Sequence, residues 1–366
     1  WSPDGKSIAY FSDASGEYEL HVKSIVSNNV KKYPLDGTGF YANIHWSPDS
    51  NKICFIDNGR NLYMLDITSK KSLKIASDEM YVPGPFRELF GDWSSDSNWI
   101  TYTVITETNF ERAYAYSITE KKSYAISDGL ANVSEPKFDP SGKYMYMLAS
   151  TDAGPVVNWF DQSNNDMDFS NAIYLVTLQK DTVSPFAKEN DAEEIKEEED
   201  EKDKDKSKDK AEKLVKIDWD GFENRIIDVP LSASDYRNLA VTSEGELFYI
   251  ANKDNTPMIH KYNIKERKED AIMPASGFQI ASKGKKMLYF NRGSIGITNV
   301  GKKAEDGPLN LSEVKVKINP RKEWENIFNE AWRVNRDYFY DPGMHGVDWK
   351  AMKQKYKVFL PSVASR

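Results

Sequence analysis

The sequence predicts an all-β fold, a β-propeller built from four-stranded blades and followed by a short helical segment. Three observations lead to this prediction. A motif returns about every 45 residues, stretches with alternating apolar side chains follow each copy, and this alternation gives way to a helical period near residue 320. Aromatic residues make up 13% of the chain, which suits strands because aromatic side chains pack well on a pleated surface.

The repeated motif opens the chain as WSPDGKSIAY. Further copies begin at Trp46, Trp93 and Phe138, and weaker copies begin at Val241 and Ile280. The first three intervals are 45, 47 and 45 residues. A fixed period of this size, with several short strands per unit, is the signature of propeller blades.

Each copy of the motif predicts a turn followed by strands. In Ser-Pro-Asp-Gly the proline fixes φ, and Gly or Asn supplies a positive φ, as a tight turn requires. The run after the first turn, Ile8 to Phe11, is the next strand. Two more strands follow in each of the first three units: YELHVKSI and VKKYPL, NLYMLDIT and SLKIAS, RAYAYSIT and KSYAIS. The sequence therefore predicts about four strands per blade.

The motif copies also predict the number of blades. Six copies give six visible blades, which together form a propeller domain over residues 1–319. Because Trp1 would end a strand that is not seen, we favour a seven-bladed ring with one blade upstream, and a six-bladed ring is the alternative. The chain starts inside the motif, so we expect it to be a segment of a longer protein.

A charged insertion interrupts the repeat. Phe138 and Val241 are 103 residues apart, and the interval contains a run, 188–213, with thirteen acidic and eight basic residues. Ordering such a run costs about 1–2 kcal/mol per residue in backbone entropy, with little apolar area to offset it. We expect residues 181–214 to form a disordered, solvated insertion. An acidic docking arm is the alternative.

The last residues, 320–366, predict two helices. Apolar residues at helical spacing define a first helix over Arg321 to Tyr338. A turn follows over Asp341 to Gly343, and Asp348 is suited to cap a second helix that Pro361 ends. The first helix carries Trp324, Ile327, Phe328, Ala331 and Trp332 on its apolar face, and the second carries Trp349, Met352, Tyr356 and Phe359. We expect these faces to pack on each other, on the propeller, or on further sequence.

Most catalytic signatures are absent from this sequence. It contains no G-x-S-x-G, H-E-x-x-H, cysteine pair or P-loop. The run GTGFYA at 37–42 leads into a strand rather than a helix, which argues against dinucleotide binding. The net charge of −8 argues against nucleic acid as a partner. The sequence contains no run of about 18 apolar residues, the length that a membrane-spanning helix needs. We predict no catalytic, cofactor-binding or metal-binding residue in this segment.

The four histidines and the single cysteine support that prediction. His21, His45 and His260 lie in predicted strands without a second ligand at metal spacing. Cys54 lies in an alternating run, which predicts a buried strand thiol. His345 is the one histidine outside the repeats, close to Asp341 and Asp348. Since these two aspartates have roles in a turn and a helix cap, we interpret His345 as a loop residue rather than a catalytic base.

The blades and the tail together resemble a known family. WSPDGK blades followed by NPRKEWENIFNEAWRVNRDYFYDPGMHGVDWKAMKQKYKVFLPSV closely resemble a tricorn-type protease, and the tail over 320–366 resembles the start of its first core subdomain. The resemblance implies a serine peptidase as the parent protein, with a PDZ domain and core domains C-terminal to this segment and a homo-oligomeric assembly. It also implies that the ring guides or filters peptides or unfolded polypeptide through its channel. No position here matches the family's catalytic serines, histidine or glutamate, and His345 lies upstream of that histidine.

A second hypothesis comes from a different class of protein. The blades alone also fit a non-enzymatic TolB-like propeller that acts as a protein–protein interaction scaffold. The helical tail distinguishes the two hypotheses, because a pure scaffold has no need of it. The resemblance favours a bacterial periplasmic or exported setting, with a cytoplasmic setting as the alternative.

Overall fold

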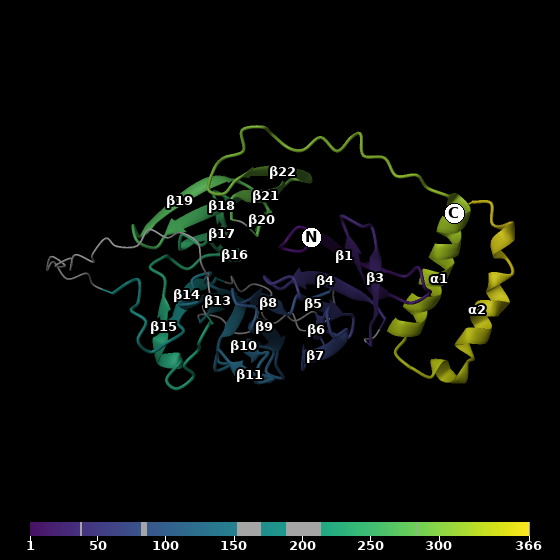
Figure 1. The fold of residues 1–366 in the computed structure, drawn as a ribbon, viewed down its shortest axis with the longest axis horizontal. Helices are drawn as coiled ribbons and strands as arrows, with labels where there is room; N and C mark the ends of the chain where they lie inside the picture. The colour runs from purple at the N-terminus through teal and green to yellow at the C-terminus, as the bar shows by residue number, and fades with distance from the viewer. Residues whose placement is uncertain (37–38, 82–85, 152–169, 188–213, 283, 366) are drawn as a thin grey trace.

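The computed structural model describes residues 1–36, 39–81, 86–151, 170–187, 214–282 and 284–365. Its strands form six antiparallel sheets that follow one another around a ring in chain order (Figure 1). The first three sheets contain β1 (Ser7–Ser12), β2 (Glu19–Ser24) and β3 (Val30–Pro34); β4 (Tyr41–Trp46), β5 (Lys52–Asp57), β6 (Asn61–Asp66) and β7 (Lys71–Ser77); and β8 (Phe90–Trp93), β9 (Trp99–Ile105), β10 (Glu111–Ser117) and β11 (Lys122–Ala125).

The other three sheets complete the ring. They contain β12 (Asn132–Phe138), β13 (Tyr144–Ser150), β14 (Ala172–Thr177) and β15 (Ile226–Asp228); β16 (Arg237–Val241), β17 (Glu246–Lys253), β18 (Thr256–Asn263) and β19 (Lys268–Pro274); and β20 (Gly277–Ile280), β21 (Lys286–Asn291) and β22 (Ser294–Asn299). The first strands β4, β8, β16 and β20 lie nearest the centre, and β3, β7, β11, β15 and β19 lie at the perimeter (Figure 1).

The blade count corrects one expectation. The described residues form six sheets, so the seven-bladed ring favoured from the sequence is not supported. The four middle sheets have four strands each, whereas the first and the sixth have three. From the second copy on, each motif copy connects the first and second strands of one sheet, whereas the copy at Trp1 leads directly into β1. The copy at Trp1 therefore belongs to the first sheet, and it does not indicate a further blade.

The turn motif has the predicted geometry, with one difference. Ser2 Oγ donates to Asp4 Oδ1 at 2.6 Å, and Ser94 Oγ donates to Asp96 Oδ1 at 2.5 Å. Gly5 has the expected positive φ of 73° in the first copy, but in the next two copies Ser50 and Ser97 have it, at 60° and 59°, rather than the neighbouring asparagines. Both of these serines accept a hydrogen bond from the preceding blade's turn, and this contact offsets part of the cost of the left-handed backbone.

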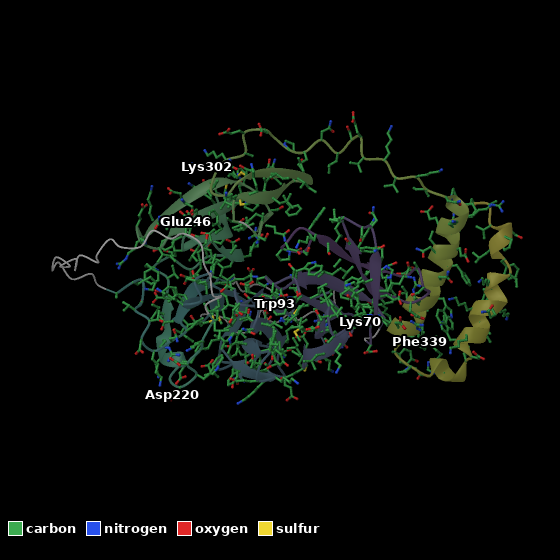
Figure 2. All side chains as sticks on the ribbon, viewed as in Figure 1. Lys70, Trp93, Asp220, Glu246, Lys302 and Phe339 are labelled. Carbon is green, nitrogen blue, oxygen red and sulfur yellow. The ribbon has the colours of Figure 1, made fainter. Side chains whose placement is uncertain are left out.

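Apolar side chains fill the spaces between neighbouring sheets. One such cluster joins Ile53 and Phe55 of the second sheet to Leu20 of the first, and another joins the second and third sheets. Cys54 belongs to the latter cluster and is fully buried, which confirms the predicted strand thiol. Trp93 lies in the same cluster, toward the middle of the ring in Figure 2. The alternation within each strand therefore serves two interfaces, one on each face of a blade.

The chain leaves the sixth sheet at Asn299 and runs to the first sheet without regular structure. Helix α1 (Pro320–Tyr338) then lies beside β3, and α2 (Trp349–Lys357) lies outside α1 (Figure 1). Asn319 caps α1, and Asp348 caps α2 by accepting from Ala351 N at 2.9 Å, as predicted. The second helix ends before Phe359 rather than at Pro361. Short 3₁₀ turns occupy Glu223–Arg225, Met344–Gly346 and Leu360–Ser362.

Two features complete the description of the chain. Residues 188–213, the main part of the predicted insertion, lie outside the described residues. None of the helices in the described part of the chain combines the length and the hydropathy needed to cross a lipid bilayer.

Candidate functional site

The most elaborate polar site joins α1 to the first blade. Arg333 is 1% exposed, although it lies on a helix that is otherwise half-buried or exposed. Its guanidinium donates to Asp13 Oδ2 at 2.5 Å, to the carbonyl of Gly16 at 2.8 Å, and to Glu330 on the same helix. The guanidinium also lies 5.0 Å from the ring centre of Tyr18. This buried cation therefore contacts two carboxylates, a carbonyl and an aromatic ring.

A second arginine, Arg336, extends the contact one helical turn further. Its two terminal nitrogens donate to the two carboxylate oxygens of Glu17 at 2.7 and 2.9 Å, a bidentate pairing that fixes orientation as well as distance. Beyond it, the ring of Tyr338 packs on Phe40 with centroids 5.3 Å apart. We call the residues Asp13, Gly16, Glu17, Tyr18, Phe40, Glu330, Arg333, Arg336 and Tyr338 the clamp.

The clamp shifts the pKa values of its own members. Arg336 holds the pKa of Glu17 below its ordinary value, and the pairing raises the pKa of Arg336. Burial and a hydrogen bond to Glu330 raise the pKa of Tyr18 to about 12. Burial alone would lower the pKa of Arg333, but its carboxylate partners outweigh this effect and raise it. All these groups therefore keep their charge states near neutral pH, so the clamp is a permanent ionic contact there.

The two helices are joined by a reciprocal pair of tryptophans. Trp332 Nε1 donates to the carbonyl of Trp349 at 2.9 Å, and Trp349 Nε1 donates to the carbonyl of Trp332 at 3.1 Å. Lys353 lies 4.3 Å from the ring centre of Trp332. Of the three alternatives expected for these helices, two are therefore observed: they pack on each other, and α1 also contacts the propeller. On the apolar face of α1, however, Ile327 is 39% exposed, and the charged clamp faces the propeller instead.

His345 occupies a strained turn between the helices. Met344, His345 and Gly346 all have positive φ, at 50°, 52° and 80°. The carboxylate of Asp341 holds this turn by accepting from Gly343 N at 2.9 Å and His345 N at 2.7 Å. This arrangement confirms the predicted role of Asp341 as a turn residue. Figure 2 labels Phe339, where the chain leaves α1 toward this turn.

The side chain of His345 contacts two polar neighbours. Its Nε2 lies 2.5 Å from the Tyr340 hydroxyl, and its Nδ1 lies 3.5 Å from Asp341 Oδ2. The imidazole is exposed. Within the described chain, none of its hydrogen-bonded partners is a serine, threonine or cysteine. The arrangement is therefore not a serine–histidine, threonine–histidine or cysteine–histidine pair of the kind used in covalent catalysis.

The other three histidines lie in strands, each near a glutamate. His21 Nε2 is 3.1 Å from Glu19, His45 Nε2 is 2.8 Å from Glu88, and His260 Nδ1 is 2.9 Å from Glu269. They belong to three different sheets, so the fold does not bring them together. Over the described ranges, no group of three or more His, Cys, Asp or Glu side chains is arranged to hold a metal ion.

A cavity of about 240 Å³ lies between the first and second sheets, lined by several serines with Asp4 and Lys31. The Ser2 hydroxyl is used by the turn, because it donates to Asp4. The lining contains no histidine to serve as a base. The indole nitrogen of Trp46 in the lining is buried without a partner in the described part of the chain, whereas Trp93 Nε1 donates to the His45 carbonyl.

The clamp was not found from the sequence. Arg333 and Asp13 are 320 residues apart, so no local pattern connects them. The available signal was indirect. Arg333 and Arg336 are spaced to share one helical face, and Asp13, Glu17 and Glu19 are clustered in the first hairpin.

The fold and the clamp together define a class of protein: a six-bladed β-propeller with a helical hairpin fixed to its first blade. Comparison with known families makes this specific. Residues 1–301 match the family described as "Tricorn protease second beta propeller domain", and residues 320–366 match "Tricorn protease C1 domain". The chain belongs to the tricorn protease family, as the predicted resemblance indicates. This finding favours the peptidase hypothesis over a freestanding scaffold.

Curated relatives carry the same name. The tricorn protease of Thermoplasma volcanium is 21% identical over 363 residues, which cover 92% of this chain and 31% of that protein. Tricorn protease homolog 1 of Streptomyces coelicolor is 25% identical over 302 residues, which cover 75% of this chain and 27% of that protein. The chain thus spans roughly a third or less of the length of these relatives.

Solved structures share the fold. The crystal structure of the tricorn protease matches with a TM-score of 0.75 at 14% identity, covering 99% of this chain and 35% of that one. Oligogalacturonate lyase from Vibrio parahaemolyticus matches with a TM-score of 0.52 at 12% identity, covering 83% of this chain and 74% of that one. At these identities the likeness concerns the fold alone.

Proposed function

We propose that this segment is the propeller and docking hairpin of a serine-type peptidase, and that the ring guides or filters peptides for a catalytic module C-terminal to it. The observation that carries the proposal is the clamp. It fixes the hairpin to the first blade, so a module built onto the hairpin would hold a constant position relative to the ring. The family matches, which assign a protease propeller and a C1 domain to this chain, support the same conclusion.

The proposal separates two tasks within one polypeptide. We place cleavage outside this segment, since no histidine among its described residues is hydrogen-bonded to a serine, threonine or cysteine. The catalytic module would supply an activated hydroxyl and an oxyanion hole. The ring would select its substrates by width, because an extended chain is narrower than a folded domain. PDZ and core domains of the same polypeptide, and further copies of it, are the partners we expect.

The first experiment tests the division of tasks. A fluorogenic peptide incubated with residues 1–366 should show no turnover. Cleavage that persists through purification and is abolished by a point substitution within residues 1–366 would overturn the proposed separation.

The second experiment tests the guiding role in the polypeptide that carries this segment with its catalytic module. Gln279 is exposed on the inner strand β20, and Cys54, the segment's only native cysteine, is buried. A Gln279→Cys variant labelled with a maleimide-linked polymer should cleave long peptides more slowly, while a short fluorogenic peptide reports on the catalytic module itself. Val26→Cys, at an 87% exposed position in a loop of the first blade, is the matched control. Equal rates for the two labelled variants would contradict guidance through the ring.

A further inference from the structure

The inner strand of each sheet has a free edge toward the centre of the ring. β8, β12, β16 and β20 are each the terminal strand of a sheet, paired on one side only. Such an edge presents backbone N–H and C=O groups that can pair with another extended chain. A ring that passes extended polypeptide therefore faces a physical problem, since its own inner edges would bind that polypeptide as an added strand.

In this structure a carboxylate occupies one of these edges. Glu135, on β12, points both of its oxygens at the next sheet, where they accept from the backbone amides of Asn238 at 2.8 Å and Leu239 at 2.5 Å, both on β16. A single side chain thus uses two amide donors of the neighbouring inner strand.

The same arrangement recurs on both sides of this pair. Asp92 Oδ2, on β8, accepts from Phe138 N on β12 at 3.0 Å. Asn238 Oδ1, on β16, accepts from Phe278 N on β20 at 2.8 Å. In every case the acceptor lies on the inner strand of one sheet and the donor lies on the inner strand of the next. Three consecutive junctions between blades carry this contact in one direction round the ring.

Irregular backbone accompanies these contacts. The pairing of β12 with β13 shifts register around Glu135, and that of β16 with β17 shifts around Asn238. Both residues have a left-handed backbone, with φ of 48° and 56°, which is uncommon for residues other than glycine. A bulge of this kind interrupts the regular row of donors and acceptors that strand addition requires.

We propose that Asp92, Glu135 and Asn238 shield the inner edges of the ring, so that an extended polypeptide passes them without being bound as an extra strand. The same hydrogen bonds also join neighbouring blades. However, apolar clusters already hold these neighbouring blades together. Joining the blades therefore does not by itself require hydrogen bonds to the amides of the inner strands. The proposal rests on the guiding function proposed above, because shielding matters only where polypeptide passes.

The test measures binding of an extended peptide to residues 1–366. The probe is a fluorescein-labelled, uncharged peptide of about ten alternating Thr and Ser residues, a length that matches a long strand. Glu135→Gly removes the carboxylate and is compatible with the positive φ at this position. It should tighten binding about tenfold in fluorescence anisotropy, since two amides become free and each hydrogen bond contributes modestly. Glu135→Gln retains one acceptor oxygen and should give a smaller gain.

Two controls make the result specific. Glu79 also accepts a backbone amide from the next blade, that of Glu107 at 3.0 Å, but neither residue lies on an inner strand. Glu79→Gly should therefore leave peptide binding unchanged. A probe N-methylated at alternate residues keeps its carbonyl acceptors, but it lacks N–H donors and carries methyl groups along the edge that would face the ring. It therefore cannot form a strand ladder and should not respond to Glu135→Gly.

The outcomes separate this proposal from the guiding function. Circular dichroism establishes that each variant is folded, and if Glu135→Gly does not fold, Glu135→Gln decides. No gain in the folded variants, or an equal gain with Glu79→Gly, overturns the shielding proposal. Tighter peptide binding that is confined to the Glu135 variants supports shielding. If the polymer at position 279 fails to slow cleavage, that failure overturns the guiding function and leaves the binding result for shielding unaffected.

Discussion

Replacing Arg333 by Met should release α1 from the first blade. Methionine keeps much of the side-chain length, but it leaves Asp13, Glu330 and the carbonyl of Gly16 without their shared donor. Removing one partner of a fully buried ion pair costs about 3–5 kcal/mol. Since the side chains of Asp13 and Glu330 are 26% and 33% exposed, water can recover part of this loss. We therefore expect the docking free energy to fall by about 2–3 kcal/mol, between the buried and the surface values.

Hydrogen exchange measured by mass spectrometry provides the assay. An undocked helix of this length is only marginally stable in water, so its amides exchange once the clamp opens. A loss of about 2–3 kcal/mol corresponds to roughly 30- to 150-fold faster exchange over residues 320–338, since about 1.4 kcal/mol is a factor of ten. Exchange in the strands of the third to fifth sheets should not change. Arg321→Met, at an exposed position on the same helix, is the matched control. Exchange in Arg333→Met within about threefold of the control would refute the reasoning.

Three further predictions concern the same region. Gly39→Ala should also loosen α1, because a Cβ at φ +115° would lie 2.2 Å from Asp337 Oδ2; limited proteolysis between the ring and α1 should speed up, and an unchanged rate would contradict this. Trp349→Phe removes one hydrogen bond between the helices, which contributes about 1 kcal/mol of stability. The midpoint temperature of helix unfolding, followed by circular dichroism, should therefore fall. An unaltered midpoint would argue against the pair with Trp332. The pKa of Glu17 lies below its ordinary 4.5 in the folded state, so its contribution is present above that pH and is lost as the pH falls through the lowered value. Exchange over α1 should rise in that acid range, and a Glu17→Gln variant should show a weaker dependence.

Much of the fold could be predicted because it is encoded locally. The WSPDG turn, the strand alternation and the cap at Asp348 each depend on residues within a few positions of one another. The blade count failed for a different reason. Trp1 was interpreted as the sign of an additional blade, whereas the motif copy that it opens belongs to a three-stranded first sheet.

The clamp and the inner-edge contacts could not be predicted in the same way. Asp13 and Arg333 meet only because the ring closes and returns the chain to its first blade, and Glu135 meets Leu239 across 104 residues. In the first contact a buried arginine pairs with a carboxylate, and in the second a carboxylate pairs with backbone amides. Hydrophobic periodicity does not detect contacts between polar groups. The apolar face of α1 left packing on α2, on the propeller and on further sequence as alternatives, and it gave no indication that a charged face would dock on the propeller.

The connection over residues 300–319 gives the molecule a mechanical property. It leaves the sixth sheet and delivers α1 to the first, where the clamp fixes the hairpin. Traction applied beyond α2 would load the ion pairs of Arg333 and Arg336 before it loads any strand ladder. The clamp therefore shields the blades from a pull on the hairpin, and the hairpin keeps its position on the first blade for as long as the clamp holds.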